Sequence, residues 1–89
     1  FGETVSTATQ GDSIIIPYLV YHPHYETIPI TREIITEGEI YKTDNLIVDR
    51  NSKEWATQDY PVGNVIFRIT CENISAQIEI KVSASTFTR

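Results

Sequence analysis

The residues with the clearest capacity for chemistry lie in a short segment where two histidines flank a proline. In an extended chain, His22 and His24 would point to the same side and could present two imidazoles to a metal ion. A third ligand would have to come from an aspartate or glutamate elsewhere, and Pro23 favours a plain loop. A stiff, exposed turn is the simpler interpretation, so we expect no metal ion and no other cofactor.

Aromatic side chains offer a second kind of candidate site. The chain has five tyrosines and one tryptophan, and aromatic faces can stack on sugar rings. Trp55 and Tyr25 lie in segments expected to be loops, which makes them the best candidates for a carbohydrate-binding surface. Because most aromatic side chains of a small domain belong to its core, a carbohydrate-binding module is the alternative function and not the first.

Catalytic arrangements are not evident in the sequence. Glu37, Glu39 and Asp44 are close to one another, but nothing places two of them in an apolar cleft where one pKa would rise. Cys71 falls on the apolar side of an alternating segment, which predicts a buried and unreactive thiol. There is no phosphate-binding loop, HExxH motif or nucleophile elbow. We therefore expect a protein without enzymatic activity.

Composition limits the partners. Seven basic and twelve acidic residues give a net charge of −5, which repels nucleic acids and anionic membranes. No apolar run approaches the roughly 20 residues that span a bilayer, so we expect no membrane insertion. The single cysteine excludes an intramolecular disulfide. Position 1 is not methionine, so the chain is expected to be processed from a longer product.

The elements that must carry these residues are strands. Fourteen isoleucines, eleven threonines and six valines stand against two leucines, and β-branched side chains favour strands over helices. No sustained helical period occurs, and turn residues recur about every ten positions, as in sandwiches and barrels. At 89 residues the chain is long enough for one core. We therefore expect residues 1–89 to form a single all-β domain of about seven strands.

A C-terminal hairpin is the clearest single element. Odd positions are apolar in residues 65–71 and even positions in residues 74–82, with Glu72 and Asn73 between them. Asn73 suits a tight turn because asparagine tolerates a positive φ, and with Ile74 and Ser75 it also forms an N-glycosylation acceptor sequence. A two-residue loop predicts the opposed apolar pairs Cys71–Ile74, Ile69–Ala76, Phe67–Ile78 and Val65–Ile80.

Further strands are expected upstream. They lie at residues 13–21, 27–36, 38–42 and 45–49, with a turn at Thr43-Asp44, whereas the polar residues 50–59 predict a loop. The N-terminal residues 3–9 alternate weakly and fit either an edge strand or a strand given to another chain. In the second case Glu3, Val5 and Thr7 would be the residues donated to a neighbouring sheet.

The segment Asp59–Ile69 (DYPVGNVIFRI) resembles the entry to the penultimate strand of bacterial immunoglobulin-like and fibronectin-type modules. In those modules an aromatic residue, proline and glycine precede alternating apolar residues. The resemblance implies an antiparallel immunoglobulin-like β-sandwich, in which Tyr60 would act as a tyrosine corner that ties a loop to the sheet through its hydroxyl. The family's disulfide and early tryptophan have no counterpart in this sequence.

The resemblance also implies a role in assembly. We expect a structural or interaction module of an extracellular or cell- or virion-surface assembly, such as a filament subunit, an adhesin module or a virion appendage. Its partners would be copies of itself or neighbouring protein modules, with a glycan as the alternative. Donation of the N-terminal strand to a neighbour would stabilise so short a sandwich.

Overall fold

The computed structural model describes residues 7–49 and 53–84 of the chain. Within these ranges it contains seven β-strands and no helix, so the all-β prediction and the expected strand count are confirmed. The strands are β1 (Thr7–Thr9), β2 (Ile14–Tyr18), β3 (Thr27–Thr36), β4 (Glu39–Asp49), β5 (Lys53–Thr57), β6 (Gly63–Cys71) and β7 (Ile74–Ser83).

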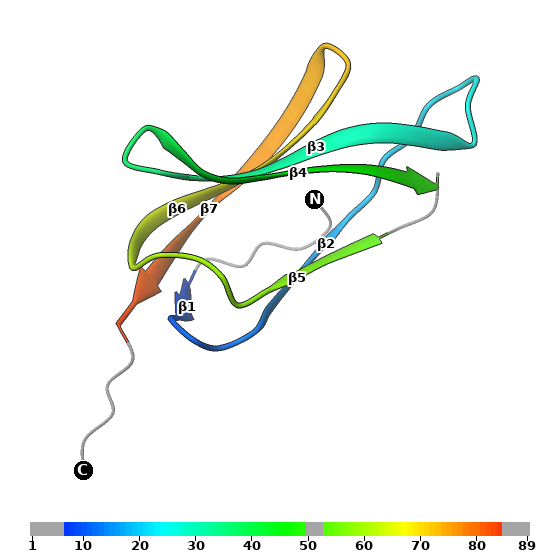
Figure 1. Cartoon of the computed structure of the whole chain (residues 1–89). Helices are drawn as coiled ribbons and strands as arrows, with labels where there is room; N and C mark the ends of the chain where they lie inside the picture. The colour runs from blue at the N-terminus through cyan, green and yellow to red at the C-terminus, as the bar shows by residue number, and fades with distance from the viewer. Residues whose placement is uncertain (1–6, 50–52, 85–89) are drawn as a thin grey trace.

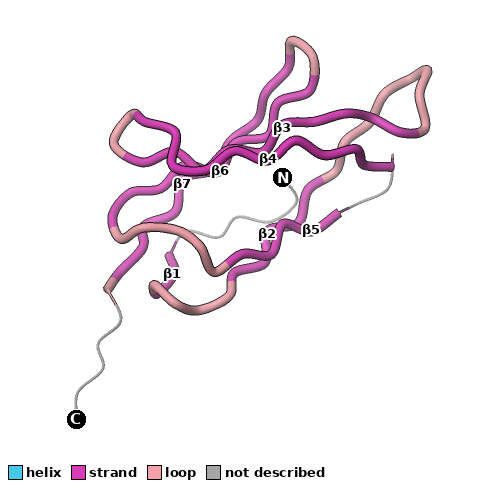
Figure 2. Tube along the Cα trace, viewed as in Figure 1, coloured by secondary structure: helices cyan, strands magenta, loops and turns pink. Residues whose placement is uncertain are grey.

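The seven strands form two sheets (Figures 1 and 2). Five strands make one sheet in the order β1-β7-β6-β3-β4, and β2 pairs with β5 in a second, two-stranded sheet. β1 runs parallel to β7, whereas the other pairs are antiparallel. Among the described strands, β1 and β4 are therefore the edges of the larger sheet.

The register of the β6–β7 hairpin is the one that the apolar alternation predicts. All four expected pairs are present, from Cys71 opposite Ile74 to Val65 opposite Ile80. The turn differs in one detail, because the positive φ of 55° belongs to Glu72. Asn73 is therefore not the residue whose left-handed backbone the turn requires.

Two expectations for the middle of the chain are wrong. The turn at Thr43-Asp44 does not form, because β4 continues through these residues and pairs them with Glu33 and Arg32 of β3. Residues 53–57 are not a loop but strand β5, which pairs with β2. Lys53–Thr57 has a single large apolar side chain, which is too little alternation to mark a strand in the sequence.

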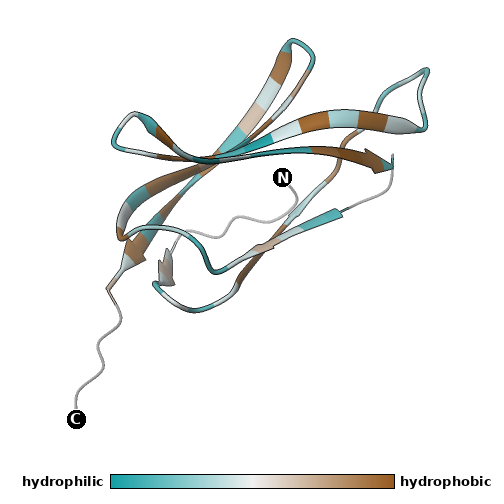
Figure 3. Ribbon diagram, viewed as in Figure 1, coloured by the Kyte–Doolittle hydropathy of each residue, from teal (hydrophilic) through white to brown (hydrophobic). Residues whose placement is uncertain are grey.

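Side chains of both sheets meet in one apolar cluster. Apolar and polar bands alternate along β3 (Figure 3), as expected of a strand that covers a core with one face. Phe67 has no exposed surface, and its ring contacts those of Trp55 and Tyr60 edge-on, at centroid distances of 5.1 and 6.3 Å. The cluster comprises Ile14, Ile16, Tyr18, Val20, Ile28, Ile30, Ile34, Val48, Trp55, Tyr60, Val65, Phe67, Ile69, Ile80 and Val82.

Tyr60 connects this core to the turn between β1 and β2. Its ring is buried, and its hydroxyl lies 3.2 Å from the carbonyl oxygen of Thr9 and in hydrogen-bond contact with that of Asp12. Tyr60 itself lies in the loop before β6, so its hydroxyl ties this loop to the last residue of β1 and to the turn that follows it. Burial and the nearby negative charge of Asp12 raise the pKa of the phenol.

Candidate functional site

The most distinctive surface lies at the end of the molecule that carries the β6–β7 turn. There, residues 19–23, which follow β2, face the tip of the hairpin across a cavity of about 260 Å³. We call this the hairpin-end groove. Its apolar lining is formed by Leu19, Tyr21, Ile69, Cys71, Ile74 and Ala76.

The groove is open to solvent although its lining is largely apolar. Leu19, Tyr21 and Ile74 are 62, 68 and 75% exposed. The apolar face of the hairpin continues past the core, because β6 and β7 have nine and ten residues and the covering strands β2 and β5 have five each. Exposure of such apolar surface to water costs free energy, and contact with a partner would recover that free energy.

His22 and Glu72 bridge the two sides of the groove. The His22 Nε2 atom lies 3.2 Å from Glu72 Oε1, and its Nδ1 atom accepts a hydrogen bond of 3.1 Å from the backbone N–H of His24. The ring of Tyr25 packs 4.6 Å from that of His22. The Nε2 atom of His22 thus joins the loop after β2 to the hairpin tip, and the Nδ1 atom forms a contact within the loop itself.

The histidines are not gathered with further ligands. The rings of His22 and His24 lie 5.8 Å apart and are tilted by 60°. Over residues 7–49 and 53–84, no group of three or more histidine, cysteine, aspartate or glutamate side chains is placed to hold a metal ion. The segment is a loop, as Pro23 indicated.

Cys71 lines the hairpin-end groove and is partly buried. The sequence predicted a buried thiol, but Cys71 lies near the tip of the hairpin, beyond the part of β6 that the second sheet covers. Burial, followed by the negative charge of Glu72, raises the pKa of the thiol. Less thiolate is therefore present at neutral pH than for a free cysteine.

This environment predicts slow modification of Cys71. At pH 8, a chromogenic disulfide reagent should react with the folded chain several times more slowly than with glutathione, because the thiolate is the reacting species. Glu72→Gln should speed the reaction, since it removes a charge that raises the pKa. A folded-state rate equal to that of glutathione would contradict the predicted protection, and the chain unfolded in urea provides the control.

The prediction that Trp55 is exposed on a carbohydrate-binding surface is wrong. Trp55 is 2% exposed, because β5 pairs it with Ile16 and turns its side chain toward the core. Its ring meets Phe67 edge-on, and the guanidinium carbon of Arg32 lies 4.9 Å from the ring centroid. Tyr25 is 59% exposed, but it has no second exposed ring at Trp55 with which to form a stacking surface.

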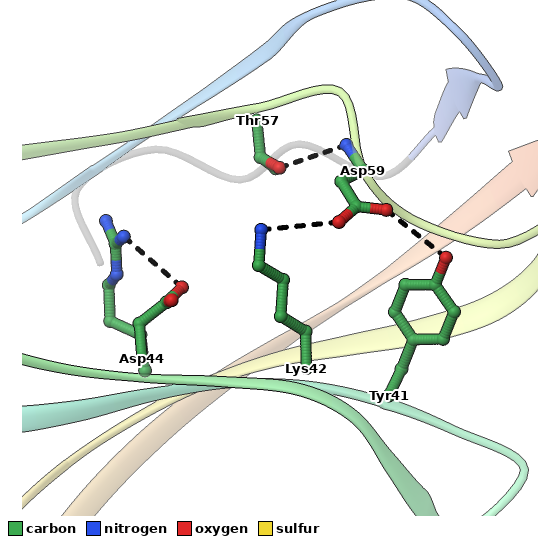
Figure 4. Close-up of polar contacts among 6 residues, drawn as sticks. Tyr41, Lys42, Asp44, Thr57 and Asp59 are labelled. Carbon is green, nitrogen blue, oxygen red and sulfur yellow. Dashed lines mark hydrogen bonds and ion pairs between the residues drawn. The ribbon is translucent and has the colours of Figure 1, made fainter.

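A polar cluster joins β4 to the segment after β5 (Figure 4). The Tyr41 hydroxyl donates to Asp59 Oδ1 at 3.2 Å, and Lys42 Nζ lies 3.3 Å from Asp59 Oδ2. The backbone N–H of Asp59 donates to Thr57 Oγ1 at 3.1 Å. The charge of Asp59 raises the pKa of Tyr41. These groups are exposed, so they bridge the two sheets weakly and form no cleft in which a general acid would be tuned.

The other carboxylates considered for acid chemistry are also separate from one another. Glu37 and Glu39 are exposed on either side of the turn that joins β3 to β4. Asp44 lies 3.5 Å from the guanidinium of Arg32, and the buried Nε atom of Arg32 has no hydrogen-bond partner among the described residues. Since none of these carboxylates shares an apolar cleft with a second one, their arrangement provides no acid–base pair.

Of the residues predicted to be donated to a neighbour, Glu3 and Val5 lie outside the described residues. Thr7 begins β1 and pairs with Lys81 of the chain's own β7. The backbone N–H of Gln10 continues this contact by donating to the carbonyl of Ser83 at 2.8 Å. The N-terminal edge strand is thus supplied by the same chain.

The sequence analysis missed the hairpin-end groove. Ile74 was expected to face inward with the rest of its strand, and the register is right although its side chain is exposed. A usable signal was present at the end of β2 and just after it, where residues at both odd and even positions are apolar: Tyr18, Leu19, Val20 and Tyr21. A strand end with two apolar faces indicates that the second face meets something other than water.

Family models, curated proteins and solved structures were compared with the chain, and none of them matches it. Across residues 7–49 and 53–84, no helix has the length and apolar character needed to cross a bilayer.

Proposed function

We propose that this chain is a non-enzymatic immunoglobulin-like β-sandwich module that acts through protein–protein contacts. In that fold, strands B and E lie in one sheet, strands C, F and G lie in the other, and strand C′ is added beside C in the variable type. If β2 is taken as strand B, the order β7-β6-β3-β4 corresponds to G-F-C-C′ and β2-β5 to B-E. Tyr60, between β5 and β6, lies where a tyrosine corner is expected.

The observation that carries the binding role is the hairpin-end groove. It is concave, apolar and open, and two exposed aliphatic residues and a tyrosine form its walls. Binding sites between proteins are commonly centred on such pockets, which take an apolar or aromatic side chain of the partner. The His22–Glu72 contact joins the two walls of the groove.

The assembly in which the module acts is part of the same proposal. The resemblance of the Asp59–Ile69 segment supports an extracellular, cell-surface or virion-surface setting, such as a filament, adhesin or appendage. Partners would be neighbouring modules or further copies of the chain. Since β1 pairs with the chain's own β7, we place the contact at the groove and not at an exchanged N-terminal strand.

Replacing Leu19, Tyr21 and Ile74 by serine tests the groove. Peptides selected from a displayed random library against the wild-type chain should carry a large apolar residue and should bind this triple variant at least about tenfold more weakly. The free energy of unfolding should change by less than about 1 kcal/mol, because the three side chains are already exposed. Denaturant titration would measure that value.

The matched control is the pair Ile15→Ser and Val62→Ser, which alters two exposed apolar residues that do not line the groove. This variant should bind the selected peptides as the wild type does. Equal binding by the groove variant, or failure to select any peptide that depends on the groove, would refute the proposed role.

A further inference from the structure

The outer edge of β4 is a second surface, and no strand among residues 7–49 and 53–84 pairs with it. β4 is the longest of the seven strands, with eleven residues, and among the described strands it pairs only with β3. Its other side presents a row of backbone N–H and C=O groups, which are a ready template for another strand. Proteins that remain monomeric usually keep such edges short.

Apolar side chains are concentrated on the same strand. Ile40, Tyr41 and Ile47 are 55, 47 and 74% exposed, and they are three of the nine large apolar residues exposed in the described part of the chain. The strand therefore has both of the features that strand addition uses, which are free backbone groups and side chains that gain from burial.

We propose that β4 pairs antiparallel with β4 of a second copy of this chain, about a two-fold axis that passes through Thr43. Two identical strands related in this way pair residues that lie at equal distances on either side of the axis. Lys42 then faces Asp44 of the second copy, and by symmetry this pair occurs twice. Residues 42–44, which form the centre of this pairing, lie in the regular part of β4, beside the bulge that leaves Tyr41 without a partner in β3.

Charge selects this register over its neighbours. With the axis at Asp44, that carboxylate faces itself. With the axis at Lys42, the ammonium group faces itself. Like charges directly opposite each other destabilise a strand pair, whereas opposite charges and apolar pairs stabilise it.

The two charged side chains have room for a further partner. The side chain of Lys42 is 42% exposed beside Asp59, and that of Asp44 is 31% exposed beside Arg32. Lysine and acidic residues also protect an edge, because an unrelated strand would leave them opposite an apolar or like-charged residue. Lys42 and Asp44 thus favour pairing of β4 with a second copy and disfavour its pairing with unrelated strands.

Charge exchange tests the pairing. Light scattering and sedimentation of the full chain over a concentration series should detect a dimer. Lys42→Asp or Asp44→Lys alone should raise its dissociation constant about tenfold, because each places like charges opposite each other twice. An equimolar mixture of the two variants should associate as the wild type does, and so should the double variant Lys42→Asp/Asp44→Lys.

A disulfide provides a measurement that does not depend on the Arg32–Asp44 contact. In a Cys71→Ser background, Thr43→Cys should cross-link two chains on oxidation, since residues that face each other across an antiparallel pair have Cα atoms about 4.5–5.5 Å apart. Asn45→Cys is the matched control. It lies about 13 Å along the strand from its own counterpart, so it should not cross-link.

This proposal goes beyond the protein-binding role of the hairpin-end groove and uses a separate surface. A wild-type chain that remains monomeric to about 1 mM, a dimer indifferent to the charge variants, or equal cross-linking at Thr43→Cys and Asn45→Cys would overturn it. The groove variant Leu19→Ser/Tyr21→Ser/Ile74→Ser should still dimerise, and the charge variants should still bind groove-selected peptides. Failure of one proposal is therefore distinguishable from failure of the other.

Discussion

Replacing Trp55 by alanine should lower the free energy of unfolding by about 3–5 kcal/mol, the cost of emptying the space of a large buried aromatic side chain. Trp55 is 2% exposed, packs against Phe67 and lies beneath the guanidinium of Arg32. A domain of this size has a total stability on the order of 5–10 kcal/mol, so the variant should be partly unfolded at physiological temperature. Urea titration followed by far-ultraviolet circular dichroism measures the loss.

Tyr25→Ala is the control for this substitution. Its ring is 59% exposed, so truncation should change the free energy of unfolding by less than about 1 kcal/mol. A Trp55→Ala variant as stable as the wild type would show that the indole is not part of the core. That outcome would restore Trp55 as a residue available for sugar stacking.

Tyr60→Phe should lower the free energy of unfolding by about 1–3 kcal/mol. The ring would still fill its site, but the carbonyl groups of Asp12 and Thr9 would lose the hydroxyl that they share. Tyr41→Phe removes the same group from an exposed position and should lower the free energy of unfolding less than Tyr60→Phe does. Equal losses in the two variants would argue against a special role for the buried contact, and urea titration of both compares them.

The raised pKa of the Tyr60 hydroxyl predicts that the free energy of unfolding depends on pH. Burial, followed by the charge of Asp12, raises the pKa of Tyr60 above its ordinary value near 10. Above that pH the unfolded chain loses the proton first, so the folded state holds more protons and stability falls as pH rises toward the folded pKa. Tyr60→Phe should have a shallower decline of stability above about pH 10, whereas an unchanged slope would exclude Tyr60 as its source.

Some features of this fold follow from local chemistry alone. The high content of isoleucine, threonine and valine determines an all-β chain, because side chains branched at Cβ favour strands. Alternation with a two-residue turn determines the β6–β7 register, since a shift by one residue would turn every apolar side chain away from the core. The contact of Tyr60 with a loop was also predictable from the resemblance of its segment.

Other features depend on strands that are distant in the sequence. Lys53–Thr57 forms a strand because β2 pairs with it. That pairing buries Trp55, so the indole is not available to stack on a sugar. β4 runs unbroken through Thr43-Asp44 because β3 provides a partner for each of these residues. Neither pairing leaves a periodic signal within the segment that it organises.

The candidate binding surfaces were decided by tertiary structure in the same way. Periodicity determines which side chains share a face of a strand, but it does not determine how much of that face another sheet covers. Here two strands of five residues lie against longer ones, so Val65 and Phe67 are buried whereas Ile74, on the same face of the hairpin, is 75% exposed. The sequence by itself therefore determined the strand class, the hairpin register and the apolar face. Only the packing of the smaller sheet decided which part of that face became core and which part remained open as a groove.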